Sequence, residues 1–443
     1  MNASALLSPS APAIGRTGAP DDDHVDLVVL VNGFPRLSET FVLQELLELE
    51  RQGLRLLVVA LSHPGEIVTQ EDLACLRAQV EHLPLAIETP RRRRTRAHAS
   101  LLERRGGRYL AARIRLRRSP DHTPGALDRG ALLASRLVRM GSPPLYIHFA
   151  HKPATIGRFA ARLAGVPYAL SCHAKDIWLT PPDELAAKVR DAELVLTCTA
   201  AGCEELQRHA AGATRVTVAY HGVDVRAAPR RSHAPGAPRI LTVGRLVEKK
   251  GHDTLIRSAA VLRDRGLEFN LRIVGEGVEW PQLQRLVHEL ELAGHVTFLG
   301  PLSPAEVQDE YACATVFALA CRQLANGDRD GLPNVVMEAM VHGLPIVSTR
   351  QAGVSEAVDE EISGLLVAVE DPHAMADALA RVLLEPELAR RLGAGARAAV
   401  TERFDRRRLL PGVVAGLAEA GLISLPCTIA PPLGAAAEER QAA

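Results

Sequence analysis

The sequence predicts an α/β protein built from two Rossmann-like, doubly wound domains that face an interdomain cleft. The chain has 443 residues, of which 47% are hydrophobic and 23% charged, so it is too long for one ordinary domain and has the composition of a folded globular protein. Short apolar runs alternate with helical patterns, which is typical of parallel sheets covered on both faces. One interior segment rich in Pro, Arg and Ser separates two such series.

The first series predicts an N-terminal Rossmann-like domain over residues 25–226. Val25–Gly53 predicts a buried strand, a Gly/Pro turn and an amphipathic helix that ends near Gly53. A second strand follows at once, which completes a βαβ unit. Strand-like runs lie at Leu54–Leu61, Leu145–Phe149, Tyr168–Ala174 and Leu194–Ala200.

The second series begins after the predicted linker, residues 227–239, and predicts a C-terminal Rossmann-like domain over residues 240–400. Its strands are expected at Ile240–Gly244, Leu271–Gly275, Val296–Gly300 and Thr315–Ala320, and its helices at His252–Gly266, Trp280–Gly294 and Ser303–Ala314. We expect residues 401–420 to form a helix that returns to the first domain. Residues 1–24 and 421–443, which are rich in Pro and Ala, are expected to be disordered tails.

Composition excludes several function classes. Basic and acidic residues number 52 each, so no net field favours nucleic acid as a partner. The seven cysteines form no CxxC pair and mostly lie in apolar runs, so we expect free thiols in a reducing cytoplasm. Prolines interrupt the first part of the chain, which argues against a secretory signal. No apolar run reaches the roughly 18 residues that a membrane-spanning helix needs.

Two cations flank the first strand-to-helix turn of the second domain. Gly244 ends a strand, Arg245 and Lys250 follow, and a helix begins near His252. Free amides and the macrodipole at a helix N-terminus favour negative charge, so this loop could hold a diphosphate. The alternative is a solvated turn, but the pattern of strand, Gly-Arg and Lys-Gly at a helix start favours the diphosphate.

Two further loops carry unusual residues. Gly275 and Gly277 repeat the strand-Gly-x-Gly arrangement, which by itself is common for geometric reasons. In Asn326–Val347, Asp330 lies in a loop and Glu338 one turn into a helix, with Pro333 in the first helical turn. Capping or a surface position could explain the two carboxylates. Because apolar residues surround Glu338, however, its carboxylate needs partners, and sugar hydroxyls are suitable ones.

The order of these motifs resembles the donor-binding half of retaining glycosyltransferases of the GT-B fold, family GT4. The motifs are "VGRLVEKKG", "IVGEGVEWPQL", "VTFLG" and "DGLPNVVMEAMVHGLPIVST". The resemblance continues in the first half through "GFPRLSETFVLQEL", "SCHAKDIW" and "VAYHGVDV", and covers about residues 25–408. Among GT4 members, the chain looks similar to bacterial enzymes of exopolysaccharide and colanic-acid-type assembly.

The resemblance implies roles for individual residues. Arg245 and Lys250 would bind the donor diphosphate, and Glu338 would bind the nucleotide ribose. Asp330 would hold a hydroxyl of the transferred sugar, surrounded by the donor-binding backbone of Gly331, Leu332, Pro333 and Asn334. The family usually has Glu at both ends of this E-x7-E motif, and the shorter Asp330 leaves the sugar contact, and so the donor, open.

Histidines of the first domain are also candidates. His173 in "SCHAKDIW" matches the family's histidine near the reaction centre, although by itself a buried histidine is more often a packing residue. Gly33 belongs to the first strand-to-helix loop, residues 33–40, which in the family faces donor phosphate and acceptor. We expect His148 and His151 to be packing residues and predict no metal site, because the sequence places no carboxylate or cysteine nearby.

The implied reaction transfers a hexose-type sugar from a UDP- or GDP-sugar to a glycan or lipid-linked acceptor, with retention of configuration and without a cofactor or required metal. The catalytic candidates are His173, Asp330 and Glu338, with the carboxylates as positioning groups and not an acid/base pair. The alternatives are a sugar phosphorylase, a nucleotide-sugar epimerase and a catalytically silent nucleotide-sugar-binding subunit.

A basic segment, Arg91 to Arg118, holds twelve arginines and one acid, Glu103. Interleaved apolar residues predict a helix, interrupted at Gly106 and Gly107, with an apolar side and a cationic side. A solvated basic face or RNA contact is the alternative. Because a polysaccharide-building transferase commonly needs a lipid-linked acceptor, we expect attachment to an anionic membrane, on the inner face of the cell membrane.

Overall fold

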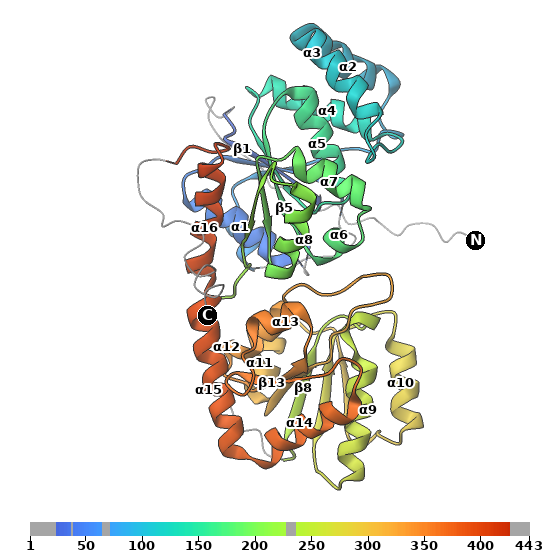
Figure 1. Cartoon of the computed structure of the whole chain (residues 1–443), viewed down its shortest axis with the longest axis vertical. Coiled ribbons are helices and arrows are strands. Elements are labelled where there is room, and N and C mark those ends of the chain that lie inside the picture. The colour runs from blue at the N-terminus through green and yellow to red at the C-terminus, as the bar shows by residue number, and fades with distance from the viewer. Residues whose placement is uncertain (1–23, 37–38, 64–70, 227–235, 426–443) are drawn as a thin grey trace, which may run out of the picture.

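The computed structural model describes residues 24–36, 39–63, 71–226 and 236–425. It confirms the predicted α/β architecture of two parallel sheets covered by helices, which stack end to end in Figure 1. Most of both predicted tails, most of the predicted linker and Cys427 lie outside the described residues. The prediction that disorder begins at residue 421 is wrong, because Leu422 and Ile423 are buried in a cluster of the first domain. No helix in the described parts of the chain is long and apolar enough to cross a membrane.

The N-terminal domain is built on one parallel sheet with the strand order β3-β2-β1-β4-β5-β6-β7. Its strands are β1 (Leu27–Gly33), β2 (Leu56–Ser62), β3 (Gln79–His82), β4 (Leu145–His148), β5 (Tyr168–Cys172), β6 (Leu194–Thr197) and β7 (Arg215–Val218). Its helices are α1 (Thr40–Arg51), α2 (Arg91–Arg105), α3 (Gly107–Arg117), α4 (Ala126–Arg139), α5 (Lys152–Ala164), α6 (Ala174–Trp178), α7 (Pro182–Arg190) and α8 (Ala200–Ala210).

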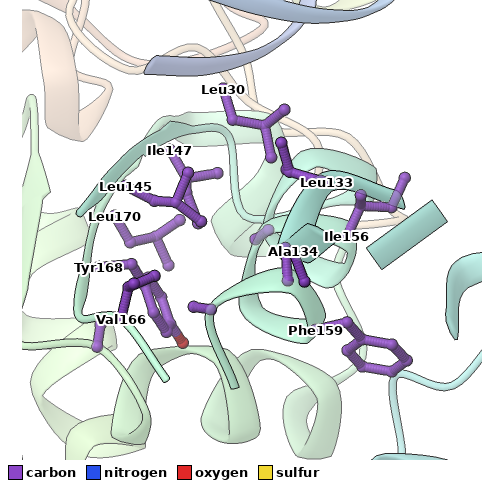
Figure 2. Close-up of a cluster of buried hydrophobic side chains, with 14 of the residues drawn as sticks. Leu30, Leu133, Ala134, Leu145, Ile147, Ile156, Phe159, Val166, Tyr168 and Leu170 are labelled. Carbon is purple, nitrogen blue, oxygen red and sulfur yellow. The ribbon is translucent and has the colours of Figure 1, made fainter. Parts of the chain in front are cut away.

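Apolar side chains on both faces of the central strands explain the short continuous hydrophobic runs of the sequence. Figure 2 shows one face, where Ile147 of β4 and Leu170 of β5 lie opposite Leu133 of α4 and Ile156 and Phe159 of α5. On the opposite face, α1 and the last helix, α16 (Arg406–Glu419), supply the covering side chains. A strand buried on both faces has no polar alternation, so its sequence is apolar throughout.

The C-terminal domain has a second parallel sheet, in the order β10-β9-β8-β11-β12-β13. Its strands are β8 (Arg239–Val243), β9 (Asn270–Val274), β10 (Val296–Gly300), β11 (Val316–Leu319), β12 (Ile346–Thr349) and β13 (Gly364–Val367). Its helices are α9 (His252–Asp264), α10 (Trp280–Glu289), α11 (Pro304–Cys313), α12 (Asn334–Val341), α13 (Ala352–Ala357), α14 (Pro372–Leu384), α15 (Pro386–Arg403) and α16 (Arg406–Glu419). β8 begins inside the predicted linker, and α15 extends beyond residue 400.

The last two helices run along both domains, as the red ribbon of Figure 1 shows. α15 packs on α12 and α14 of the second domain, whereas α16 packs on α1 of the first. Val413, Val414 and Leu417 of α16 share one buried cluster with Leu27 and Leu46. The chain therefore crosses between the domains twice, before β8 and again between α15 and α16.

The basic segment forms two helices, α2 and α3, at the end of the first domain farthest from the second (Figure 1). They meet at Gly106, whose φ of 54° explains why the predicted helix is interrupted there. The apolar residues do not form one side as predicted: Leu101, Tyr109 and Leu116 are buried against the domain. The exposed apolar residues, Leu102, Leu110 and Ile114, lie instead among exposed arginines.

Candidate active site between the domains

Two glycine-bearing turns pack against each other at the carboxyl ends of β8 and β9. A Cβ atom added to Gly275 would lie 2.1 Å from the carbonyl oxygen of Gly244, and one added to Gly277 would lie 2.2 Å from that of Leu246. These positions have no room for a side chain. The second glycine turn therefore supports the backbone of the first, which carries Arg245 and leads to α9.

Lys250 lies in the turn before α9 and is paired with a carboxylate. Its Nζ is 2.7 Å from Oδ2 of Asp330, while Nζ of the neighbouring Lys249 is 3.4 Å from Oδ1. Lys249 also contacts Oδ1 of Asp328 at 3.0 Å. The structure thus brings Lys250 and Asp330 together, although the sequence predicted separate ligands for them. Arg245 is exposed near Lys250.

Burial and charge act in opposite directions on this ion pair. Burial alone would raise the pKa of Asp330, but Lys250 and Lys249 outweigh it and hold that pKa below its ordinary value. Burial likewise opposes the charge on Lys250, and Asp330 raises the Lys250 pKa above the ordinary value. Both groups are therefore charged at neutral pH. The Sγ of Cys321 lies 3.3 Å from Oδ2 of Asp330 and completes the immediate surroundings.

Glu338 projects from α12 into different surroundings. The helix begins at Asn334, so Pro333 immediately precedes it and does not lie in its first turn as predicted. Oε2 of Glu338 accepts a hydrogen bond from the Tyr311 hydroxyl at 3.0 Å, and burial raises the pKa of Glu338. Asn334 and Glu338 line an interdomain cavity of about 160 Å³ together with Phe41 and Arg406.

The loop between Asp330 and α12 touches the first domain. A Cβ on Gly331 would lie 3.3 Å from Sγ of Cys198 and 3.6 Å from Cβ of Ala174. The predicted donor loop is thus next to the segment that contains His173.

His173 caps α6 at the end of β5 and is buried in a ring cluster. Its ring lies 4.7 Å from the rings of Phe41 and Phe149 and 5.1 Å from that of His221, between centroids. Nε2 is 3.4 Å from Oγ of Ser171, whereas Nδ1 has no hydrogen-bond partner among the described residues. Burial and the neighbouring histidines lower the pKa of His173 well below its ordinary value, so the ring is neutral.

Asp176 fixes the backbone around His173. Its Oδ1 accepts the backbone N–H of His173 at 2.9 Å, and Oδ2 accepts that of Ala150. Burial raises the pKa of Asp176 to about 7, partly offset by these backbone hydrogen bonds. The Asp in "SCHAKDIW" therefore holds the turn in place and does not pair with the His173 ring.

The other predicted residues of the first domain have mixed surroundings. Gly33 is the last residue of β1, where an added Cβ would lie 3.2 Å from Oγ of Ser62, while residues 37–38 of the same loop lie outside the described residues. His151 caps α5 through Nδ1, which fits a structural role. The expectation that no carboxylate lies near His148 is wrong, because the buried Glu45 carboxylate is 3.7 Å from its Nε2.

Comparison with known proteins identifies the kind of enzyme. The family described as "Glycosyl transferases group 1" matches residues 226–399. The putative colanic acid biosynthesis glycosyltransferase WcaL of Escherichia coli (strain K12) is 28% identical over 364 residues, 78% of this chain and 88% of WcaL. The chain is a glycosyltransferase of the GT-B fold, and its match to the group 1 family lies in the C-terminal domain.

Two further similarities support this assignment of the glycosyltransferase. The GDP-mannose-dependent alpha-(1-6)-phosphatidylinositol monomannoside mannosyltransferase of Mycobacterium tuberculosis (strain H37Rv) is 35% identical over 168 residues, 38% of this chain and 44% of that protein. The crystal structure of HepE from Anabaena in complex with UDP covers 89% of this chain and 100% of HepE, with a TM-score of 0.68 and 18% identity, and so shows the shared fold.

Sequence reasoning missed several residues of the glycosyltransferase's cleft. Lys249 joins the charged cluster, Cys198 and His221 lie beside His173, and Glu356 bridges the domains. A doubled "KK" and the position of Cys198 near the carboxyl end of a predicted strand were the available signals. Which of these side chains would meet across the cleft depends on the contact between the two domains, and no local pattern encodes that contact.

Proposed function

We propose that the protein transfers a hexose-type sugar from a UDP- or GDP-sugar to a glycan or lipid-linked acceptor with retention of configuration, in cell-surface or exopolysaccharide biosynthesis. The contact between Lys250 and Asp330 carries the proposal. It places the expected diphosphate ligand directly beside the expected sugar ligand, with Nζ of Lys250 2.7 Å from Oδ2 of Asp330, so one glycosyl phosphate could reach both side chains once their mutual contact opens. The names of the relatives support this range of donors and acceptors: GDP-mannose and a phosphatidylinositol mannoside for the mycobacterial enzyme, UDP for HepE, and colanic acid for WcaL.

Donor binding would exchange partners within this cluster. The diphosphate would take Lys250 and Arg245 beside the start of α9, and Asp330 would become free to accept a hydrogen bond from a sugar hydroxyl. As the bond from the anomeric carbon to the phosphate oxygen breaks, Arg245 and Lys250 stabilise the growing negative charge. The acceptor oxygen bonds to the same carbon from the same face, and its proton passes to the departing phosphate oxygen.

The test is turnover of a panel of UDP- and GDP-sugars with glycan and polyprenyl-linked acceptors. We expect one donor to yield a glycoside with the donor's anomeric configuration, read by NMR. Turnover that requires inorganic phosphate would indicate a phosphorylase, and conversion of the donor without an acceptor would indicate an epimerase. Donor binding without any product would favour the silent subunit. An inverted product would contradict retention alone.

Metal independence is part of the proposal, because two cations of the chain are available for the diphosphate. We expect transfer to retain its rate after treatment with EDTA and removal of the chelator by dialysis. Loss of turnover that Mg²⁺ or Mn²⁺ restores would contradict charge stabilisation by Arg245 and Lys250.

A second proposal concerns attachment to an anionic membrane through α2 and α3. Nine of the twelve arginines in residues 91–118 are exposed, and Leu102, Leu110 and Ile114 lie between them with 42%, 44% and 55% of their surface exposed. Each basic residue near an anionic surface contributes about 1 kcal/mol, and exposed apolar side chains add insertion. This arrangement supports a cytoplasmic enzyme held on the inner face of the cell membrane.

The structure suggests which arginines to change. Arg94 pairs with Asp128 at 2.7 Å and should be kept, whereas Arg91, Arg92, Arg93 and Arg96 are exposed. Changing these four to Gln should abolish salt-sensitive binding to anionic vesicles, measured by co-sedimentation against neutral vesicles. Changing exposed arginines of the other domain, Arg257, Arg285, Arg390 and Arg391, is the matched control and should leave binding intact. Equal binding to both vesicle types would contradict the proposal.

A further inference from the structure

Three neighbouring strands of the first sheet each end in a metal-ligating side chain. His173 follows β5, Cys198 follows β6, and His221 follows β7 by three residues. β5, β6 and β7 are adjacent and parallel, and their pairing places Cys172 opposite Thr197 and Thr197 opposite Val218. The carboxyl ends of parallel strands meet at one edge of a sheet, so the topology itself brings the three side chains together.

The three side chains lie close enough together to become ligands of one metal ion. One ligand atom from each of His173, Cys198 and His221 lies within 4.8 Å of the other two. Bond lengths of about 2.3 Å to sulfur and about 2.0 to 2.1 Å to nitrogen place the ligands of a tetrahedral zinc ion about 3.3 to 3.6 Å apart. Small side-chain rotations would close the difference, and His221 is only half-buried.

A second observation concerns a ring nitrogen of His173. Nδ1 of His173 is buried without a hydrogen-bond partner among the described residues, although buried polar atoms are nearly always paired. The side chain as a whole is 9% exposed. Imidazole nitrogen and thiolate sulfur together select zinc over magnesium or calcium, and three protein ligands leave a fourth position open.

We infer that His173, Cys198 and His221 bind Zn²⁺, and that the bound ion inhibits the glycosyltransferase. Binding releases the Cys198 proton to solvent and leaves a thiolate on the metal. The ion would then be bound to the sulfur of Cys198, which lies 3.3 Å from a Cβ placed on Gly331, beside the Asp330 loop. It would also take His173 away from the reaction centre. The inhibition rests on the proposed function, whereas the binding does not.

Binding is tested with Co²⁺ as a spectroscopic probe and Zn²⁺ as its competitor. Wild-type protein should show a thiolate-to-cobalt charge-transfer band that saturates at one equivalent of Co²⁺. Addition of Zn²⁺ should remove this band. Cys198→Ser should lose the band, and His221→Gln should weaken Zn²⁺ binding about tenfold or more. Cys75→Ser, which removes an exposed thiol elsewhere, is the matched control and should change neither. Circular dichroism and thermal unfolding verify that each variant is folded.

Inhibition is tested on each variant relative to its own metal-free rate. Micromolar Zn²⁺ should inhibit wild-type and Cys75→Ser protein, and EDTA should reverse this inhibition. Inhibition of Cys198→Ser should require at least tenfold more Zn²⁺. A wild-type cobalt spectrum without the thiolate band, or a band that persists in Cys198→Ser, would overturn the site. A band without inhibition would overturn its regulatory role. If no donor is turned over at all, the proposed function fails, while the spectrum still decides the metal site.

Discussion

At the scale of single residues, Asp330 and Glu338 are distinguished by their partners. Asp330 faces two lysines and Glu338 faces the Tyr311 hydroxyl, so the two carboxylates do not share a task. We expect Asp330→Asn mainly to slow transfer or loosen sugar choice, and Glu338→Gln mainly to weaken donor binding. Loss of a charge-assisted hydrogen bond costs about 1.5 to 3 kcal/mol, or about one to two orders of magnitude.

Steady-state kinetics and donor titration separate the two effects. Asp328→Asn is the matched control for the loop, because Asp328 pairs with Lys249, whereas Lys250 pairs with Asp330. It should leave kcat within a few-fold of the wild-type value. If Asp330→Asn and Glu338→Gln both kept near-wild-type kinetics, the charged loop would be only a capped turn.

Glu45 should make the stability of the first domain depend on pH. Burial raises its pKa to about 7 from an ordinary value of 4.5, although the Tyr146 hydroxyl, 2.7 Å from Oε2, partly offsets this. The folded state therefore binds this proton more tightly than the unfolded state. The Glu45 contribution is most favourable below about pH 4.5 and is lost as pH rises through about 7.

Chemical denaturation of wild-type and Glu45→Gln protein between pH 5 and 8 checks this sign. As pH rises, the free energy of unfolding of Glu45→Gln should increase relative to that of the wild type. The total relative increase should be roughly 3 kcal/mol at most. Tyr146→Phe retains the buried carboxyl but removes a hydrogen bond that lowers the Glu45 pKa, so it should keep a pH dependence and extend it to higher pH. A pH-independent difference between Glu45→Gln and wild type would show that Glu45 does not titrate in this range.

At the scale of elements, the second glycine turn has the clearest steric requirement. Gly277→Ala would place Cβ 2.2 Å from the carbonyl oxygen of Leu246, so the turn carrying Arg245 must move. We expect a loss of about 1 to 3 kcal/mol in unfolding free energy and weaker donor binding. Gly294→Ala is the control, because no atom lies within 4 Å of its added Cβ, and it should be nearly neutral. Equal thermal stability of the two variants would contradict this account.

The sequence predicted most elements because their apolar pattern is set by burial. The strands at Ile240–Gly244 and Tyr168–Ala174 were predicted because they are buried on both faces. The edge strands Gln79–His82 and Arg215–Val218 were missed, since they are only partly buried and lack a continuous apolar run. Among site residues, the pairing of Lys250 with Asp330 could not be predicted, because it depends on how a loop 80 positions away folds back.

At the scale of the whole molecule, Glu356 joins the two domains. From α13 of the second domain, its carboxylate accepts the backbone N–H groups of Ala200 and Ala201 at the start of α8, at 2.8 and 3.3 Å. The Tyr220 hydroxyl donates to the same carboxylate at 3.0 Å. A negative charge at a helix N-terminus is stabilised by the free amides and the macrodipole, so this contact favours the closed arrangement of the domains.

Domain closure should therefore weaken when the carboxylate is removed. Glu356→Ala removes charge-assisted hydrogen bonds worth about 1 to 3 kcal/mol, which shifts an open–closed equilibrium about 5- to 150-fold toward the open form. We expect Glu356→Ala to have a larger radius of gyration than the wild type by small-angle X-ray scattering. Saturating donor should reduce the radius of gyration of the variant, and the KM for the donor should be raised. Glu356→Gln still offers an oxygen acceptor and should show a smaller shift, while Glu402→Ala, at an exposed position on α15, should show none. An unchanged radius of gyration in Glu356→Ala would mean that other contacts hold the domains together. One such contact is the Arg329 guanidinium, which stacks 3.9 Å from the centre of the Trp178 ring.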